Sequence, residues 1–282
     1  MASAALRLRR KAGNAVFVAF CLVTTTIALG LLALILFSLL KNGIGGLDAK
    51  VFTMSTPAPG TPGGLINAIT GSLMMCSIGM ILGVVIGILA GTWLAEYGGA
   101  SAYGKVIRFL NDVLLSAPSI LIGLFVYLLM VKPFHGFSAL AGSVALALIA
   151  IPVITRTTED VLKLQAASLR ESGVALGTPL STTIRKIIWR AASSGLATAA
   201  LLAFARISGE TAPLLFTSLG NQFQNFNLLK PTSALPQVIF NFAMSPYDDW
   251  RRLAWVGAIL ITVAVLATQI VARLLIREQR RS

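Results

Sequence analysis

The sequence predicts an all-α, polytopic membrane protein with about six transmembrane helices and a cytoplasmic loop between the fourth and the fifth. Three observations lead to this fold class. Of the 282 residues, 56% are hydrophobic and only 12% are charged, whereas a soluble domain carries about 25% charged residues. The apolar residues form long stretches, and lipid tolerates such stretches only when their backbone is hydrogen-bonded internally, as in a helix. The net charge of +13 comes from basic residues gathered at the ends of these stretches.

Six stretches approach or exceed the roughly 20 residues that cross a bilayer. They cover residues 14–40, 65–95, 109–131, 138–154, 191–216 and 253–275. The first follows a basic segment, as a signal peptide would, but it is well over the about 7–15 apolar residues of a signal sequence, so we expect it to be retained. The chain is therefore expected to form one transmembrane domain, 1–282, with a core region at roughly 65–276 and the cytoplasmic loop at roughly 158–190.

The distribution of basic residues predicts the orientation. With six spans both termini share one side of the membrane. On that side lie most of the Lys and Arg residues, in segments 7–11, 105–108, 156–190 and 273–281, and the other side holds few, in segments 41–50, 132, 230 and 251–252. Because positive residues favour the cytoplasm, both termini are expected there. The basic residues then face the anionic lipid headgroups of the bilayer, so we expect no nucleic-acid partner.

Two outward segments are rich in turn-forming residues. Residues 57–64 contain three prolines and three glycines, and residues 221–227 combine Asn and Gln with Phe223 and Phe226. Such segments are either solvated connectors or a docking surface for an external partner, and the residues leave both interpretations open.

Four glycines recur at every fourth position of the second span: Gly79, Gly83, Gly87 and Gly91. This spacing places them on one face of a helix. Small residues are the usual means by which membrane helices approach closely, so we predict a packing face.

Little in the sequence predicts an enzyme or a cofactor bound by this chain. Gly99, Gly104 and Lys105 match the first part of a nucleotide-binding P-loop, but Val106 occupies the position of the hydroxyl that would bind magnesium. ATP and magnesium, if used, are expected in another subunit. The single histidine, His135, has no carboxylate or cysteine neighbours in the sequence, so no metal site is expected.

The cytoplasmic segment from Leu169 reads LRESGVALGTPLSTTIRKIIWRAA. It is too polar to cross the membrane, and Thr178 and Pro179 are expected to divide it into two short helices. The segment resembles the cytoplasmic loop of ABC importer permeases, whose hallmark is E-A-A-x-x-x-G. Here Glu171, Gly173, Ala175 and Gly177 lie in an E-S-G-x-x-x-G variant. The resemblance implies a coupling loop that docks on an ATP-hydrolysing subunit, with Gly177 forming a turn and with Gly173 and Ala175 allowing close approach of the partner.

The fifth span contains the sequence R-I-S-G-E-T-A-P from Arg206 to Pro213. At about 1.5 Å per residue, Arg206 lies roughly 22 Å from the inner end of the apolar stretch and about 15 Å from its outer end. A charged residue at such depth costs about 2.5–3.5 kcal/mol. Either Arg206 and Glu210 neutralise each other on one helix face, or they line a substrate pathway beside a kink at Pro213.

Arg206, Gly209, Glu210, Thr211 and Ala212 resemble the R-x-x-G-E-T-A stretch of the phosphate importer permeases. The segments Leu94–Gly98 and Ala117–Phe125 support the same branch of the family. The resemblance implies a pathway for inorganic phosphate that includes Arg206, Glu210 and Thr211. It also implies a bacterial plasma membrane location, a second homologous permease, two P-loop ATPase subunits and an external phosphate-binding protein.

Two other functions remain open from the residues. One is an ABC permease for another oxyanion, such as sulfate or molybdate. The other is a secondary transporter driven by an ion gradient, in which Glu210 would carry protons.

Overall fold

The computed structural model describes residues 4–99 and 101–279, and the all-α fold class is confirmed. The longer helices are α1 (Ala4–Gly43), α3 (Ile66–Glu96), α4 (Ala102–Ser116), α6 (Ala139–Lys163), α9 (Trp189–Ser208) and α12 (Asp248–Gln279). The shorter helices and helical turns are η1 (Ile44–Gly46), α2 (Lys50–Thr53), α5 (Ser119–Val126), η2 (Tyr127–Val131), α7 (Ala167–Ala175), α8 (Leu180–Thr183), η3 (Ile184–Ile188), α10 (Ala212–Thr217) and α11 (Leu235–Ala243).

The expected number of spans is confirmed. Within the described ranges, five helices are long and apolar enough to cross a membrane, and a sixth span results if the bent pair α4 and α5 counts as one. The bend is a correction to the third predicted span, which was expected to be continuous over residues 109–131. The chain bends by 106° between the two parts of that span. The cause is Pro118, which disfavours a helical conformation at Ala117, and Ala117 is extended, with ψ of 134°.

The fourth and fifth spans also have different boundaries from those expected. α6 continues through Pro152 to Lys163, well beyond the predicted end at residue 154. The fifth membrane helix begins at Leu180, because α8, η3 and α9 follow one another without a break, and it ends at Ser208. The predicted stretch 191–216 is therefore interrupted, and its last part forms the separate helix α10.

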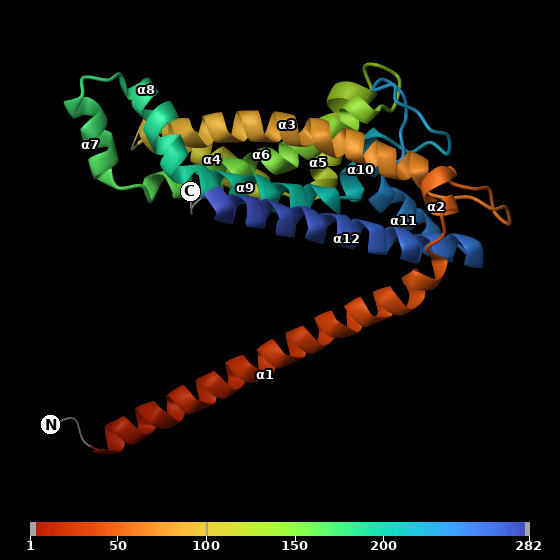
Figure 1. Cartoon of the computed structure of the whole chain (residues 1–282), viewed down its shortest axis with the longest axis horizontal. Coiled ribbons are helices and arrows are strands. Elements are labelled where there is room, and N and C mark those ends of the chain that lie inside the picture. The colour runs from red at the N-terminus through yellow and green to blue at the C-terminus, as the bar shows by residue number, and fades with distance from the viewer. Residues whose placement is uncertain (1–3, 100, 280–282) are drawn as a thin grey trace.

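Figure 1 shows α3, α6, α9 and α12 running along the bundle, with α7 and α8 projecting from one end. The first turns of α1 and the last turns of α12 lie toward that same end, whereas α2 and α11 lie at the opposite end. α1 leaves the bundle at an angle and contacts it near Gly43, where a Cβ atom would lie 2.4 Å from Cδ1 of Ile259. The basic residues Arg280 and Arg281 lie outside the described residues.

α3 and α6 form the most closely packed helix pair. Gly79, Gly83, Gly87 and Gly91 are all buried against α6. A Cβ atom on Gly79 would lie 3.0 Å from Cβ of Leu146, and one on Gly91 would lie 2.6 Å from the carbonyl oxygen of Thr155. The glycines thus let the two helices approach backbone to backbone. A buried apolar cluster joins this pair to α9 and α10 and includes Met75, Leu146, Ile154, Ile207 and Leu214.

Candidate functional site

The fifth span breaks two residues after Arg206. α9 ends at Ser208, residues 209–211 are not helical, and α10 begins at Ala212 with Pro213 in its first turn. Proline is tolerated there because the first amide groups of a helix have no helical partner. The backbone N–H of Glu210 donates to the carbonyl oxygen of Ile207 at 3.2 Å. The expected disturbance beside Pro213 is therefore a complete break, which places Glu210 and Thr211 outside the helix that carries Arg206.

The expectation that Arg206 and Glu210 share a helix face is wrong, because the helix ends between them. Among the described residues no ion pair joins the two side chains. Arg206 is exposed, and Glu210 and Thr211 are partly buried. The alternative of a simple neutralising bridge within this chain thus loses its geometric basis.

The two faces of α9 differ in what they contact. One face buries Ala199, Ala203 and Ile207 in the bundle. The other is exposed and carries Leu202, Arg206 and, just beyond the helix, Gly209. Arg206 therefore points out of this chain at membrane depth, on a stripe that the chain itself leaves uncovered.

The break after α9 is held by α5. A Cβ atom on Gly123 would lie 2.6 Å from Cα of Pro213 and 3.0 Å from its carbonyl oxygen. The sequence of α5 begins just after the bend at Pro118, so two interrupted spans pack on each other through Gly123 and Pro213. Interrupted backbone at membrane depth is tolerated where it is buried in protein or lines a cavity. Gly123 belongs to a segment that the sequence analysis singled out, but nothing in the sequence predicted its contact with Pro213.

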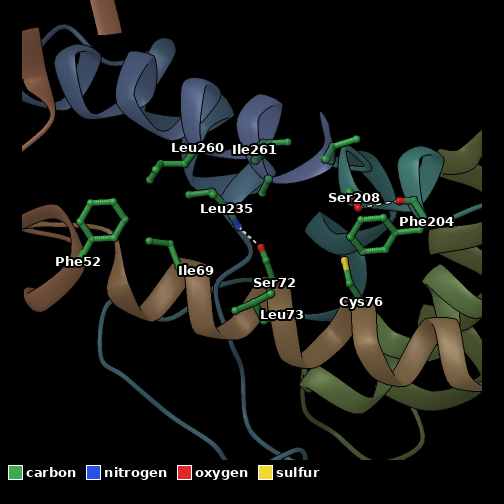
Figure 2. A pocket seen from close by; sticks show the side chains of 12 residues that line it. Phe52, Ile69, Ser72, Leu73, Cys76, Phe204, Ser208, Leu235, Leu260 and Ile261 are labelled. Carbon is green, nitrogen blue, oxygen red and sulfur yellow. Dashed lines mark hydrogen bonds between the residues drawn. The ribbon is translucent and has the colours of Figure 1, made fainter. Parts of the chain in front are cut away.

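A cavity of about 270 Å³ lies between α3, α9, α11 and α12. Figure 2 shows its walls, which are mainly apolar side chains such as Phe52, Ile69 and Leu260. Its two hydroxyl groups are engaged with backbone: Ser72 Oγ accepts from the Leu235 N–H at 2.6 Å, and Ser208 Oγ donates to the Phe204 carbonyl at 2.6 Å. An anion would find no cation in this cavity, so the cavity does not suit a charged substrate.

The predicted coupling loop contains α7 and α8, which are separated at Thr178 and Pro179 as expected. The expectation of two short helices is correct only for α7, because α8 is the first turn of the long helix that continues to Ser208. Gly177 has φ of +65°, the left-handed conformation that favours glycine. The N–H of Gly177 donates to the Val174 carbonyl at 2.9 Å, and the N–H of Thr178 donates to the Gly173 carbonyl at 3.1 Å. These two hydrogen bonds form a Schellman motif, which ends α7 and turns the chain toward α8.

Gly173 lies inside this loop. It is buried, and a Cβ atom on it would meet the side chain of Thr183 in α8. The close approach that Gly173 permits is therefore between the two helices of the loop. Glu171 and Ala175 are exposed, as are Val174 and Leu176, at 71% and 77%. Exposed apolar side chains beyond the end of the bundle are typical of a surface that a partner covers.

Two arginines at the end of the bundle that carries α7 pair with buried carboxylates, and the sequence did not predict either pairing. Arg170 in α7 forms a bidentate contact with Glu96, at 2.9 Å from Nε and 2.6 Å from Nη2. Arg108 in α4 donates from Nε to Glu159 in α6 at 2.7 Å. The side chains of Glu96 and Glu159 are only 4% and 2% exposed. The hydrogen bonds that Arg170 donates to Glu96 raise the pKa of Arg170 above its ordinary value, so this arginine stays charged.

A polar cluster around Asn67, at the start of α3, joins two loops. The side-chain amide of Asn67 donates to Thr56 Oγ1 at 3.0 Å and to the Asn221 carbonyl at 2.8 Å. Phe223 and Phe226 are 78% and 67% exposed. Thr56 is thus held against the segment 221–227, and the two aromatic side chains of that segment project from it. Elsewhere in the described residues, no group of three or more His, Cys, Asp or Glu side chains could hold a metal ion.

Residues 83–281 match the model of a protein family described as "binding-protein-dependent transport system inner membrane component". The chain is 49% identical to the phosphate transport system permease protein PstA of Haemophilus influenzae, over 96% of each chain. It is 34% identical to the probable phosphate transport system permease protein PstA of Methanocaldococcus jannaschii, over 83% of each chain. Among solved structures, an inward-facing form of the MetNI methionine ABC transporter is similar with a TM-score of 0.63 and 20% identity, over 76% of this chain and 95% of that chain.

Proposed function

This chain belongs to the family of binding-protein-dependent transport system inner membrane components, in its phosphate permease branch, and on that premise we propose that Arg206 lines its path for inorganic phosphate. The chain is a permease subunit of an ABC importer and a transport component rather than a catalytic one. It spans the inner membrane several times. We further propose that both termini face the cytoplasm, as the basic residues predict.

The observation that carries this proposal is the exposure of Arg206 on a face of α9 that this chain leaves open. An arginine exposed to hydrocarbon costs about 2.5–3.5 kcal/mol, so something polar must cover it. The cavity between α3, α9, α11 and α12 is apolar and offers no cation to an anion. The path therefore runs along the surface of this chain, and a second, homologous permease completes it from the other side.

The chemistry of the three residues at the break suits a tetrahedral oxyanion. The guanidinium of Arg206 is planar and always charged, and it can form two parallel hydrogen bonds with phosphate. The hydroxyl group of Thr211 can donate a further hydrogen bond. Glu210 repels an anion, so its role is to keep phosphate from binding too tightly to leave. Arg206 lies in the last turn of α9, and Glu210 and Thr211 lie in the non-helical segment that follows it.

ATP hydrolysis belongs to the partner subunits of the importer. We propose two P-loop ATPase subunits that bind ATP and magnesium and contact α7 and α8 through Glu171, Ala175 and the exposed Val174 and Leu176. A phosphate-binding protein delivers substrate at the outer end. ATP and the loaded binding protein drive transport because each prefers a different conformation of the permease pair.

Phosphate uptake into proteoliposomes containing the complete importer tests the proposed path. Arg206→Ala is expected to lower uptake by at least about 30-fold, the effect of losing one partner of a desolvated ionic contact. Arg206→Lys should retain part of the uptake, because it keeps the charge but loses the planar fork. Leu202→Ala is the matched control on the same exposed stripe, and it should transport normally.

Competing anions test the substrate. Excess sulfate or molybdate should leave phosphate uptake unchanged, and uptake should require ATP. Normal phosphate uptake after replacing both Arg206 and Glu210 by leucine would refute the path. Uptake driven by an ion gradient without ATP would refute the proposed energy source.

A further inference from the structure

The loop that ends the bundle on the cytoplasmic side is attached to the rest of the chain in an unusual way. In α7, which the structure describes throughout, Gly173 is the one buried residue, and its neighbour is Thr183 of α8 within the same loop. The apolar contact of α7 with the transmembrane helices is made by Leu169, which is partly buried against a small cluster that includes Leu162 of α6 and Ala192 of α9. The position of α7 therefore depends on this small contact, on polar contacts and on the chain connections at its ends.

Arg170 supplies those polar contacts. Besides its two hydrogen bonds to Glu96, its Nη1 donates to the Gln165 carbonyl at 3.0 Å and its Nη2 donates to the Leu162 carbonyl at 2.9 Å. Glu96 is the last residue of α3, and Leu162 lies in the last turn of α6. One side chain thus joins the docking loop to the cytoplasmic ends of two transmembrane helices.

These two helices are the pair whose glycine stripe brings their backbones together. A displacement of the end of α3 therefore also displaces α6, because closely packed interfaces resist continuous deformation. Two further side chains donate hydrogen bonds to the end of α3. Arg108 of α4 donates from Nη2 to the Leu94 carbonyl at 3.0 Å. Trp189 of α9 donates from Nε1 to Thr92 Oγ1 at 3.1 Å. The last turns of α3 are the meeting point of α4, α7 and α9.

The loop has a second connection, through the chain itself. The helix that starts at Leu180 continues without interruption to Ser208, two residues beyond Arg206. A partner that moves α7 and α8 therefore moves α9 directly and α6 through residues 164–166, whereas the end of α3 is linked to the loop by the ion pair of Arg170 and Glu96.

We propose that Arg170 and Glu96 are positioning residues for energy coupling: their ion pair transmits the movement of the docked loop to the α3–α6 pair. The proposal rests on the proposed function, in which ATPase subunits dock on this loop. Without the ion pair, the ATPase subunits still dock and hydrolyse ATP, but hydrolysis no longer moves the α3–α6 pair together with the docked loop. The same arrangement accounts for a carboxylate kept 96% out of solvent at the end of an apolar helix.

The test uses the complete importer in proteoliposomes and measures two quantities in one preparation. The first is the ATPase rate with and without the phosphate-loaded binding protein, and the second is phosphate uptake. Arg170→Ala is expected to assemble and to keep the basal ATPase rate within about twofold, while stimulation by the binding protein falls at least about fivefold and ATP consumed per phosphate rises. Arg156→Ala is the matched control, because Arg156 is a cytoplasmic arginine whose ion pairs with Asp112 and Asp160 are exposed.

Glu96 provides an independent measurement, since it contacts Arg170 but not the two carbonyl groups. Glu96→Ala should reproduce the effect of Arg170→Ala, and the double variant should be no worse than either single one, because all three remove the same contact. Arg170→Lys should recover part of the stimulation. A carboxylate and a lysine form an ion pair but not the bidentate geometry.

Three outcomes would overturn the inference. They are normal stimulation and stoichiometry in Arg170→Ala, additive losses in the double variant, or loss of ATPase binding in all the variants, which would make the ion pair a support for the docking surface alone. Failure of the proposed function is distinguishable, because it would appear as unchanged uptake in Arg206→Ala. ATPase stimulation in the Arg170 and Glu96 variants is measured independently of the anion path.

Discussion

Glycine brings backbones together in two regions of this molecule, with opposite results. Between α3 and α6, four glycines in series join two unbroken helices along about three turns. Between α5 and α10, the single Gly123 contacts Pro213, and both helices adjoin a break. The first contact makes a pair that moves as one body, and the second supports irregular backbone beside Arg206. Close backbone contact therefore stiffens the α3–α6 pair, whereas between α5 and α10 it supports a segment whose polar groups are exposed.

The largest expected effect is at the four glycines of α3 that pack against α6. Gly91→Leu should destabilise the permease by more than about 3 kcal/mol, because the side chain would have to occupy the space of the Thr155 carbonyl and Thr158. Thermal unfolding in detergent and the amount of protein in the membrane measure the loss. Gly30→Leu in α1 is the control, since a Cβ atom there has no neighbour within 4 Å. Equal stability of the two variants would mean that α3 and α6 separate easily.

The next effect concerns the break. Gly123→Ala should cost about 2 kcal/mol and should lower phosphate uptake, because a methyl group would press on the backbone of Pro213. Gly209→Ala lies in the break itself, but nothing is within 4 Å of its Cβ position, so its thermal stability should stay near that of the parent. If both variants unfold at the same temperature, the α5 contact does not support the break.

A third glycine allows the effect of backbone conformation to be measured apart from the effect of steric crowding. Gly177 has open surroundings but a positive φ. Gly177→Ala should cost about 1 kcal/mol at the end of α7 and should weaken binding of the ATPase subunit several-fold. Gly177→Asn is the control, since asparagine adopts this conformation more readily. Titration of ATPase subunits onto the purified permease pair gives the affinities. An asparagine variant that binds as weakly as the alanine variant would contradict the conformational explanation.

The smallest expected effect tests the link between the two regions. Trp189→Phe removes the hydrogen bond from the α9 indole to Thr92 of α3 and leaves a smaller aromatic ring in its place. The loss should be at least about 0.5–1 kcal/mol in thermal unfolding, the net value of one hydrogen bond, because the smaller ring also loses packing. Thr92→Val should give a similar change, and the double variant should not exceed the single ones. Independent, additive changes would show that the two groups do not act as a pair.

Much of this fold could be predicted because lipid leaves an apolar chain few choices. The helices, the number of spans, the packing face of Gly79 to Gly91 and the division of the loop at Pro179 all follow from local spacing. The bend at Pro118 had a local signal, but the apolar stretch on both sides of it concealed the change of direction. Hydropathy measures whether a segment is buried in lipid, and it does not measure where the segment points.

The candidate site was harder to predict because its geometry depends on contacts between distant segments. Arg206 and Glu210 were expected on one face, and the end of α9 at Ser208 separated them. The pairs Arg170 with Glu96 and Arg108 with Glu159 join residues more than 50 positions apart. One signal did exist for them: a carboxylate near the end of each of two apolar helices requires a cation nearby.

The π-helical turn η3 sets the direction in which Arg206 points. Residues 184–188 make wider turns than an α-helix, and they lie between the docking loop and α9. Such turns hold one extra residue, so returning this one to α-helical hydrogen bonding would rotate all that follows by about 100°. That angle is enough to carry the guanidinium from the open stripe toward the face of Ile207. The hydrogen-bonding register of this one turn thus sets the direction of a charge that lies more than four helical turns away.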